Sequence, residues 1–197
     1  MPMWMRSKRK ILAPVLLALL APPSLSATTL VRLSLDQLAA GADGVARVRC
    51  LSAESRWENG SIWTVTTAEV IDSMKGKLPS VIAIRLPGGR AGHFTATVDG
   101  TPKFHPGDEA ILFLESSRAG GYTVAGWVEG TFRIARDVRT GSETVTQDST
   151  AFAVFDPVAR AFRREGIRGM AIAEFRAHVA AAIARAEMGP RGEEKTR

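Results

Sequence analysis

The apolar run at residues 110–114 constrains the fold more than any other segment. It follows a Pro-Gly turn at 106–107 and the acidic pair Asp108 and Glu109. The run is short for a helix and has no polar face, which favours a strand buried on both sides. Two layers must therefore cover it. Asp108 is predicted to cap the turn, and Glu109 to lead into the strand.

The dipeptide Asn59-Gly60 predicts a tight hairpin. It lies between two alternating runs, and a type I′ turn requires positive φ at both central positions. The resulting register pairs residues across the two strands. The expected pairs are Glu58 with Ser61, Trp57 with Ile62, and Arg56 with Trp63.

Short strands separated by turn residues fill most of the chain. We expect them at 45–56, 62–73, 81–86, 94–98, 110–114, 122–127, 131–134 and 143–146. Turns at this density indicate an all-β barrel or sandwich. Residues 148–166 have no clear period, and Phe152, Val154 and Phe155 are expected to pin that segment to the barrel.

Two helices are predicted outside the strands. Ser34 is a suitable N-cap for a short helix that ends near Gly41. A second helix, about 168–187, carries one apolar stripe. The stripe consists of Ile172, Phe175, Val179 and Ile183. We expect this amphipathic helix to pack on the outer face of the strand at 110–114.

The N-terminal segment has the pattern of a secretory signal peptide, at 1–27. Basic residues at 6–10 precede an apolar stretch at 11–20, and Leu25-Ser26-Ala27 offers small residues for cleavage. Retention as an uncleaved membrane anchor is the alternative. The apolar stretch is short for a bilayer-spanning helix and broken by prolines, which argues against the anchor. No membrane span is expected after cleavage. A single β-barrel domain at 28–187 and a disordered tail at 188–197 follow.

The net charge of +6 derives mostly from the signal segment. Four basic and no acidic residues lie in 1–27, so 22 basic and 20 acidic residues remain, a net charge of +2. No clustered basic face is evident, which argues against nucleic-acid binding. Cys50 is the only cysteine, so no internal disulfide is expected. It is interpreted as a small buried hydrophobe on a strand rather than as a nucleophile.

The order of several short motifs resembles a family of exported bacterial proteins of uncharacterised function, over residues 40–135. The motifs are Ala42-Asp43-Gly44-Val45, Trp63-Thr64, Lys75-Gly76, Pro87-Gly88-Gly89, Phe104-x-Pro106-Gly107-Asp108-Glu109 and Leu112-Phe113-Leu114. The layout is more distantly similar to netrin-like domains, the class that includes tissue inhibitors of metalloproteases. That resemblance implies a small OB-like, closed or partly open antiparallel barrel with flanking helices.

The inhibitory mechanism of that class does not carry over. It requires an N-terminal cysteine, and here no cysteine precedes Cys50 in the expected mature chain. The resemblance assigns no functional residue to this sequence.

No pattern of catalytic or metal-ligating residues is evident. His93 and His105 with Asp108 and Glu109 lack the spacing of established zinc motifs. The adjacent carboxylates of Asp108 and Glu109 point to opposite faces of a strand and cannot share one substrate bond. We therefore expect no enzyme activity, no catalytic residue, no metal and no cofactor.

Aromatic and arginine side chains provide the best candidate for a binding site. Arg56, Trp57 and Trp63 cluster at the predicted hairpin tip, and Trp127 ends a later strand. In the competing interpretation the tryptophans only cap the barrel, with Arg56 stacked on Trp63.

The sequence thus predicts an exported, periplasmic or extracellular, monomeric protein-binding module. Its partner would be another exported protein, for example a protease. A netrin-type protease inhibitor and a hydrolase without a recognised motif are the alternatives.

Overall fold

The computed structural model describes residues 30–188, so the predicted signal peptide and all but the first residue of the predicted tail lie outside it. The chain is mainly β, with one short and one long helix. In chain order the elements are α2 (Leu35–Gly41), β1 (Gly44–Glu58), β2 (Ser61–Lys75), β3 (Val81–Pro87), β4 (Gly89–Ala91), β5 (Phe94–Ala96), β6 (Glu109–Ser116), β7 (Tyr122–Val124), β8 (Thr131–Arg136), β9 (Glu143–Gln147), the 3-10 turn η1 (Asp148–Ala151), β10 (Val154–Asp156), β11 (Ala161–Arg163), β12 (Met170–Ala171) and α3 (Ile172–Met188).

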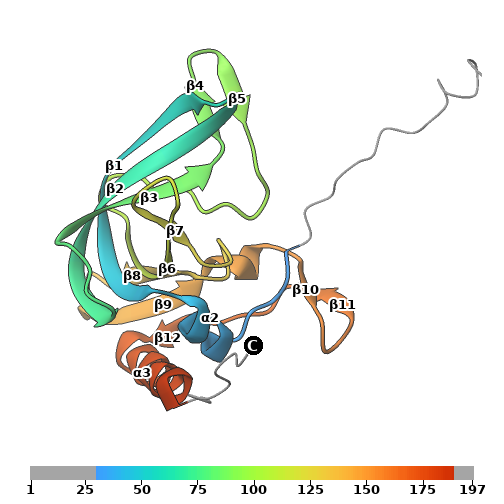
Figure 1. Ribbon diagram of the computed structural model, residues 1–197. Helices are drawn as coiled ribbons and strands as arrows, with labels where there is room; N and C mark the ends of the chain where they lie inside the picture. The colour runs from blue at the N-terminus through green and yellow to red at the C-terminus, as the bar shows by residue number, and fades with distance from the viewer. Residues whose placement is uncertain (1–29, 189–197) are drawn as a thin grey trace, which may run out of the picture.

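The main sheet curls into a ring-like arrangement (Figure 1). Its strand order is β1-β2-β3-β7-β6-β8-β9-β12, and β1 also pairs with β6. The pairing of β3 with β7 is parallel, through Ile84 and Tyr122, whereas the other pairings are antiparallel. The expectation of an entirely antiparallel sheet is therefore wrong at this one contact.

Strand β6 separates two apolar cores, which confirms the prediction that it is buried on both faces. Ala110, Leu112 and Leu114 belong to the cluster inside the ring, to which β1, β2, β3, β6 and β7 contribute. Ile111 and Phe113 belong to a second cluster outside it. The alternation follows from the two-residue period of a strand, which turns successive side chains to opposite faces.

The helices cover the second cluster. Ser34 caps α2, and its hydroxyl accepts a hydrogen bond from the Gln37 amide at 3.2 Å, as expected for a capping box. In α3, Phe175, Val179 and Ile183 are buried, as the apolar stripe predicts. Figure 1 shows both helices at the end of the molecule opposite the β4–β5 hairpin.

The long helix reaches β6 less directly than expected. Its Phe175 ring lies 4.7 Å from that of Phe132 on β8, and Phe132 lies 5.6 Å from Phe113 on β6. Helix α2 contacts both β6 and α3. The outer face of β6 is therefore covered by α2 and Phe132, and α3 packs over them.

Several strands differ from their predicted bounds. The strand expected at 94–98 ends at Ala96 and pairs with β4 in a small hairpin. The strand expected at 122–127 ends at Val124, because Trp127 adopts a turn conformation with φ of 54°. Residues 148–166, which lack a period, form η1 and the β10–β11 hairpin. Val154 is buried there, as expected, while Phe155 is only half-buried.

Among residues 30–188, no helix is long and apolar enough to cross a membrane.

Candidate functional site

The β1–β2 hairpin forms with the register that its turn predicts. Asn59 and Gly60 have φ of 49° and 79°, and Glu58 pairs with Ser61. Trp57 lies near the tip and is 52% exposed. Its ring makes an edge contact with Phe94 of β5, with the centroids 5.5 Å apart.

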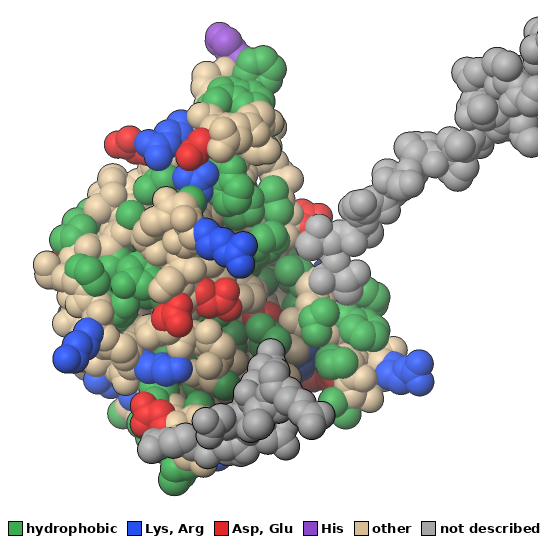
Figure 2. All heavy atoms as spheres, in the orientation of Figure 1, with side chains coloured by type: hydrophobic (Ala, Val, Ile, Leu, Met, Phe, Trp, Pro, Cys, Tyr) green, Lys and Arg blue, Asp and Glu red, His purple; other side chains and the backbone are tan. Residues whose placement is uncertain are grey.

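Phe94 is itself 63% exposed, so two large aromatic side chains from separate hairpins stand together at the surface. Figure 2 shows hydrophobic side chains gathered at this end of the molecule. Phe94 was expected on a strand, but its contact with Trp57 was not predicted. The only signal for it is an apolar residue that directly follows the turn at Gly92-His93.

Trp63 is covered by a different arginine from the one expected. The guanidinium of Arg85 on β3 lies 4.6 Å from the Trp63 ring centroid, and it is held by Glu58 at 2.6 Å. Arg56 lies opposite Trp63 in the register, but its side chain is 67% exposed and approaches Glu58 at 3.9 Å. The predicted stacking of Arg56 on Trp63 is therefore wrong, since Arg85 occupies that ring face.

The structure brings three of the four candidate residues together. Arg56, Trp57 and Trp63 share the hairpin tip. Trp127 lies in the turn between β7 and β8 and packs partly buried against the cluster inside the ring. We call Arg56, Trp57, Trp63 and Phe94 the tip surface.

A cavity of about 220 Å³ adjoins the tip hairpin. Ser55 on β1 and Thr64 on β2 lie in its wall and are hydrogen-bonded to each other at 2.8 Å. Gly89 must be glycine here: it has φ of 124°, and a Cβ atom would lie 2.2 Å from the Ser55 Oγ. The glycine brings the β4–β5 hairpin down onto the two hydroxyl groups.

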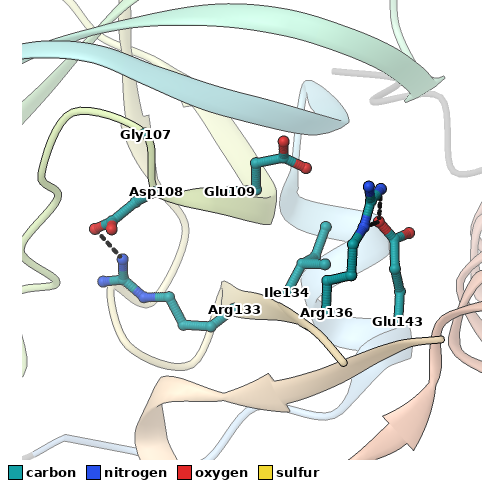
Figure 3. A pocket seen from close by; sticks show the side chains of 7 residues that line it. All are labelled: Gly107, Asp108, Glu109, Arg133, Ile134, Arg136 and Glu143. Carbon is teal, nitrogen blue, oxygen red and sulfur yellow. Dashed lines mark hydrogen bonds and ion pairs between the residues drawn. The ribbon is translucent and has the colours of Figure 1, made fainter. Parts of the chain in front are cut away.

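A second depression, of about 410 Å³, lies on the outer face of β6 and β8 (Figure 3). We call it the charged groove; its lining consists of Gly107, Asp108, Glu109, Arg133, Ile134, Arg136 and Glu143. Asp108 also accepts a hydrogen bond from the His105 amide at 2.9 Å, which confirms its predicted role as the cap of the Pro-Gly turn.

Arg47 on β1 links the two glutamates of the charged groove. Its guanidinium donates two hydrogen bonds of 2.9 Å to Glu143, and it also binds Glu109. Arg49, two residues further along β1 on the same face, donates a hydrogen bond of 2.7 Å to Glu109. Arg136 donates to Glu143 at 2.6 Å. The network thus joins β1, β6, β8 and β9 across the groove.

These contacts lower the pKa values of both glutamates. Hydrogen bonds from Arg47 and then Arg136 lower the pKa of Glu143 from 4.5 to about 2. Burial by itself raises the pKa of Glu109, but hydrogen bonds from Arg47 and Arg49 outweigh it, so the net shift is downward. Both carboxylates are therefore charged at neutral pH and far from the range useful for proton transfer.

We expect the free energy of unfolding to fall as the pH is lowered from about 4.5 towards 2. A carboxylate whose pKa is lower in the folded chain stabilises it above the unfolded pKa, and this contribution is lost as the folded group takes up its proton. Urea unfolding midpoints measured at several pH values test this. Glu143→Gln should reduce the slope, and a midpoint that stays constant over this range would contradict the assignment.

The remaining titratable candidates are not assembled into a centre. Cys50 is buried, and burial raises the pKa of its thiol. This agrees with its interpretation as a buried strand residue. The Nδ1 atom of His105 lies 3.6 Å from Asp108. Within residues 30–188, no group of three or more His, Cys, Asp and Glu side chains is placed to hold a metal ion.

One buried carboxylate was not anticipated from the sequence. Glu129, in the turn between β7 and β8, is almost fully buried, and burial raises its pKa. It accepts hydrogen bonds from the Leu33 amide at 3.3 Å and from Gln147 at 3.2 Å. Glu129 thereby ties the segment before α2 to the sheet.

No protein-family model matches this sequence, and a search of curated proteins finds no match either. The resemblance to exported bacterial proteins and to netrin-like domains therefore stays a prediction.

Proposed function

We propose that this chain is an exported, non-enzymatic binding module that recognises another protein through the tip surface. The observation that carries the proposal is the exposed contact between Trp57 and Phe94. Exposed aromatic side chains lose water contact at little cost in conformational entropy, and together with arginine they dominate the energetics of protein interfaces. Arg56 adds a cation that is 67% exposed at the same hairpin tip, on the face of β1 that carries its partner Trp63.

An OB-like barrel is the fold that best accounts for the arrangement. The ring of β1, β2, β3, β7 and β6, with the parallel contact between β3 and β7, supports it. Barrels of this class bind ligands on one strand face and its adjoining loops. The tip surface and the neighbouring cavity lie at one such end, formed by the β1–β2 and β4–β5 hairpins.

The charged groove supports binding or structural roles better than catalysis. Its acidic side chains are engaged by arginines: Asp108 by Arg133 at 3.1 Å, and Glu109 and Glu143 by Arg47. The lowered pKa values of Glu109 and Glu143 make both poor general acids or bases at neutral pH. Export from the cytoplasm rests on the signal pattern at 1–27.

Affinity capture from an envelope or culture-fluid extract tests the proposal. Trp57→Ala and Phe94→Ala should each reduce retention of a specific partner at least tenfold, because an interface anchor contributes about 2 kcal/mol or more. Leu51→Ala is the matched control. Leu51 is also an exposed apolar residue of β1, at 47% exposure, but the register shift between Cys50 and Ser52 separates its face of the strand from that of Trp57.

The urea unfolding midpoints of all three variants should stay close to that of the parent chain, since their side chains are about half exposed. Equal retention by the Trp57→Ala and Leu51→Ala variants would refute the assignment of the tip surface. A hydrolase activity that copurifies with the chain would refute the proposal that it is not an enzyme.

A further inference from the structure

The cavity beside the tip surface has a wall of hydroxyl groups. Its lining residues are Ala53, Ser55, Thr64, Thr66, Leu86, Pro87, Gly88, Gly89, Ala96, Thr97, Val98, Thr101, Pro102, Lys103, Phe104 and His105. Ala53 and Ser55 alternate along β1 on the face that continues to Trp57. The cavity and the exposed aromatic pair therefore belong to one continuous surface.

The direction of one hydrogen-bond chain in this wall is fixed. The Thr64 hydroxyl donates its single hydrogen to the Gly88 carbonyl at 2.7 Å. The Ser55 hydroxyl must therefore donate its own hydrogen to Thr64, across 2.8 Å. The Ser55 oxygen is left with lone pairs only, so it can act towards a ligand as an acceptor.

Two further hydroxyl groups have no protein partner within the described part of the chain. Thr66 is 1% exposed, and its Oγ1 atom is buried without a hydrogen bond. The Oγ1 atom of Thr101 is in the same situation. A buried hydroxyl without a partner costs about 1–3 kcal/mol, so a water molecule or ligand group that reaches either hydroxyl would be stabilising. Each can both donate and accept.

The cavity therefore suits a small neutral group that both donates and accepts hydrogen bonds. An anion could only accept, and would leave the Ser55 oxygen without a donor. The lining contains no carboxylate to hold a cation. At about 220 Å³ the cavity lies below the roughly 300–1,000 Å³ typical of sites for whole drug-sized ligands, but it can hold one side chain.

We infer that this cavity receives the carboxamide side chain of an asparagine or glutamine from a protein bound at the tip surface. The inference rests on the proposed function, because the tip surface supplies the partner. The amide N–H group would donate to Ser55, the amide oxygen would accept from Thr66 or Thr101, and Leu86 and Phe104 would pack on the aliphatic stem.

NMR titration of the full chain with propionamide tests the chemistry of the cavity without the partner. The backbone and methyl resonances of Thr66 and Thr101 should shift and saturate, with a dissociation constant on the order of 10 mM for a probe this small. Propionate, which has the same shape but carries a negative charge, should produce no saturable shift. N-acetylglucosamine should bind at least fivefold more weakly than propionamide.

Thr66→Val removes the hydroxyl and keeps the shape of the side chain. Propionamide binding should weaken about fivefold or more, the effect of one hydrogen bond. The urea midpoint should stay the same or rise, because the parent hydroxyl has no protein partner to lose. Thr67→Val is the matched control: Thr67 is the next residue of β2 and points to the other face, so binding should be unchanged.

Each result decides the inference. Saturable binding of propionamide that Thr66→Val weakens supports it. Preference for propionate identifies an anion site near Lys103, and preference for N-acetylglucosamine identifies a sugar site; either overturns it. The absence of a shift with every probe means that the cavity holds water only, and also overturns it. The capture experiment with Trp57→Ala is independent of these titrations, so the proposed function can stand when this inference fails.

Discussion

Replacing Phe132 by alanine is expected to lower the free energy of unfolding by about 3–5 kcal/mol, the largest effect of any single substitution considered. Phe132 is completely buried on β8. Its ring contacts Phe113 on one side and Phe175 on the other, so it joins the central strand to the long helix. The substitution removes these contacts and leaves a cavity. Since small domains are stable by only about 5–15 kcal/mol, the variant should approach the limit of folding.

Urea unfolding followed by fluorescence or circular dichroism measures this loss. Phe162→Ala is the matched control, because Phe162 on β11 is 60% exposed and contacts only Phe155 among the aromatic rings of the described chain. That variant should lose less than about 1 kcal/mol. If the two substitutions cost the same, Phe132 does not connect the sheet to the helices as described.

Replacing Arg47 by methionine is expected to cost about 2–3 kcal/mol at pH 7. Methionine has a similar length, but it leaves the partly buried carboxylates of Glu109 and Glu143 without their shared cation. Removing one partner of such a pair is costly because the other charge stays in place and is poorly hydrated. The lost hydrogen bonds also allow both pKa values to rise towards their ordinary range.

The pH dependence separates this effect from a packing defect. The difference between the parent chain and Arg47→Met should shrink as the pH approaches 2, where the glutamates become protonated in both. Arg49→Met is the control: Arg49 also binds Glu109, but it is largely exposed, so its loss should cost at most about 1 kcal/mol. A loss for Arg47→Met that is independent of pH would indicate packing instead.

Local signals in the sequence predicted much of the fold. The Asn59-Gly60 turn fixes its hairpin register through backbone conformation alone, and every predicted pair near the tip is present. The unbroken apolar run of β6 likewise required a cover on each face, and both are found. Such features depend on neighbouring residues and on strand or helix periodicity, which a single sequence contains.

The features that the sequence did not predict depend on contacts between distant segments. From the sequence alone, either Arg56 or Arg85 could stack on the Trp63 ring. The β2–β3 register places Arg85 over the ring, and its ion pair with Glu58 holds it there. Phe94 joins the tip surface only because Gly89 lets the β4–β5 hairpin approach Ser55. The cavity and the charged groove, whose links run from Arg47 to Glu143, depend on closure of the ring in the same way.

The pairing of β1 with both β2 and β6 has a kinetic consequence. The first partner, β2, follows after a two-residue turn, so this hairpin can form within microseconds. The second partner, β6, lies more than sixty positions along the chain, as in the pair Arg47 and Ile111. The intervening chain must therefore lose conformational entropy before β1 and β6 can pair. Topologies with such remote neighbours mature over milliseconds to seconds. During that interval the apolar strand β6 is unpaired with β1 and accessible to other molecules. The newly made chain is then most prone to aggregation.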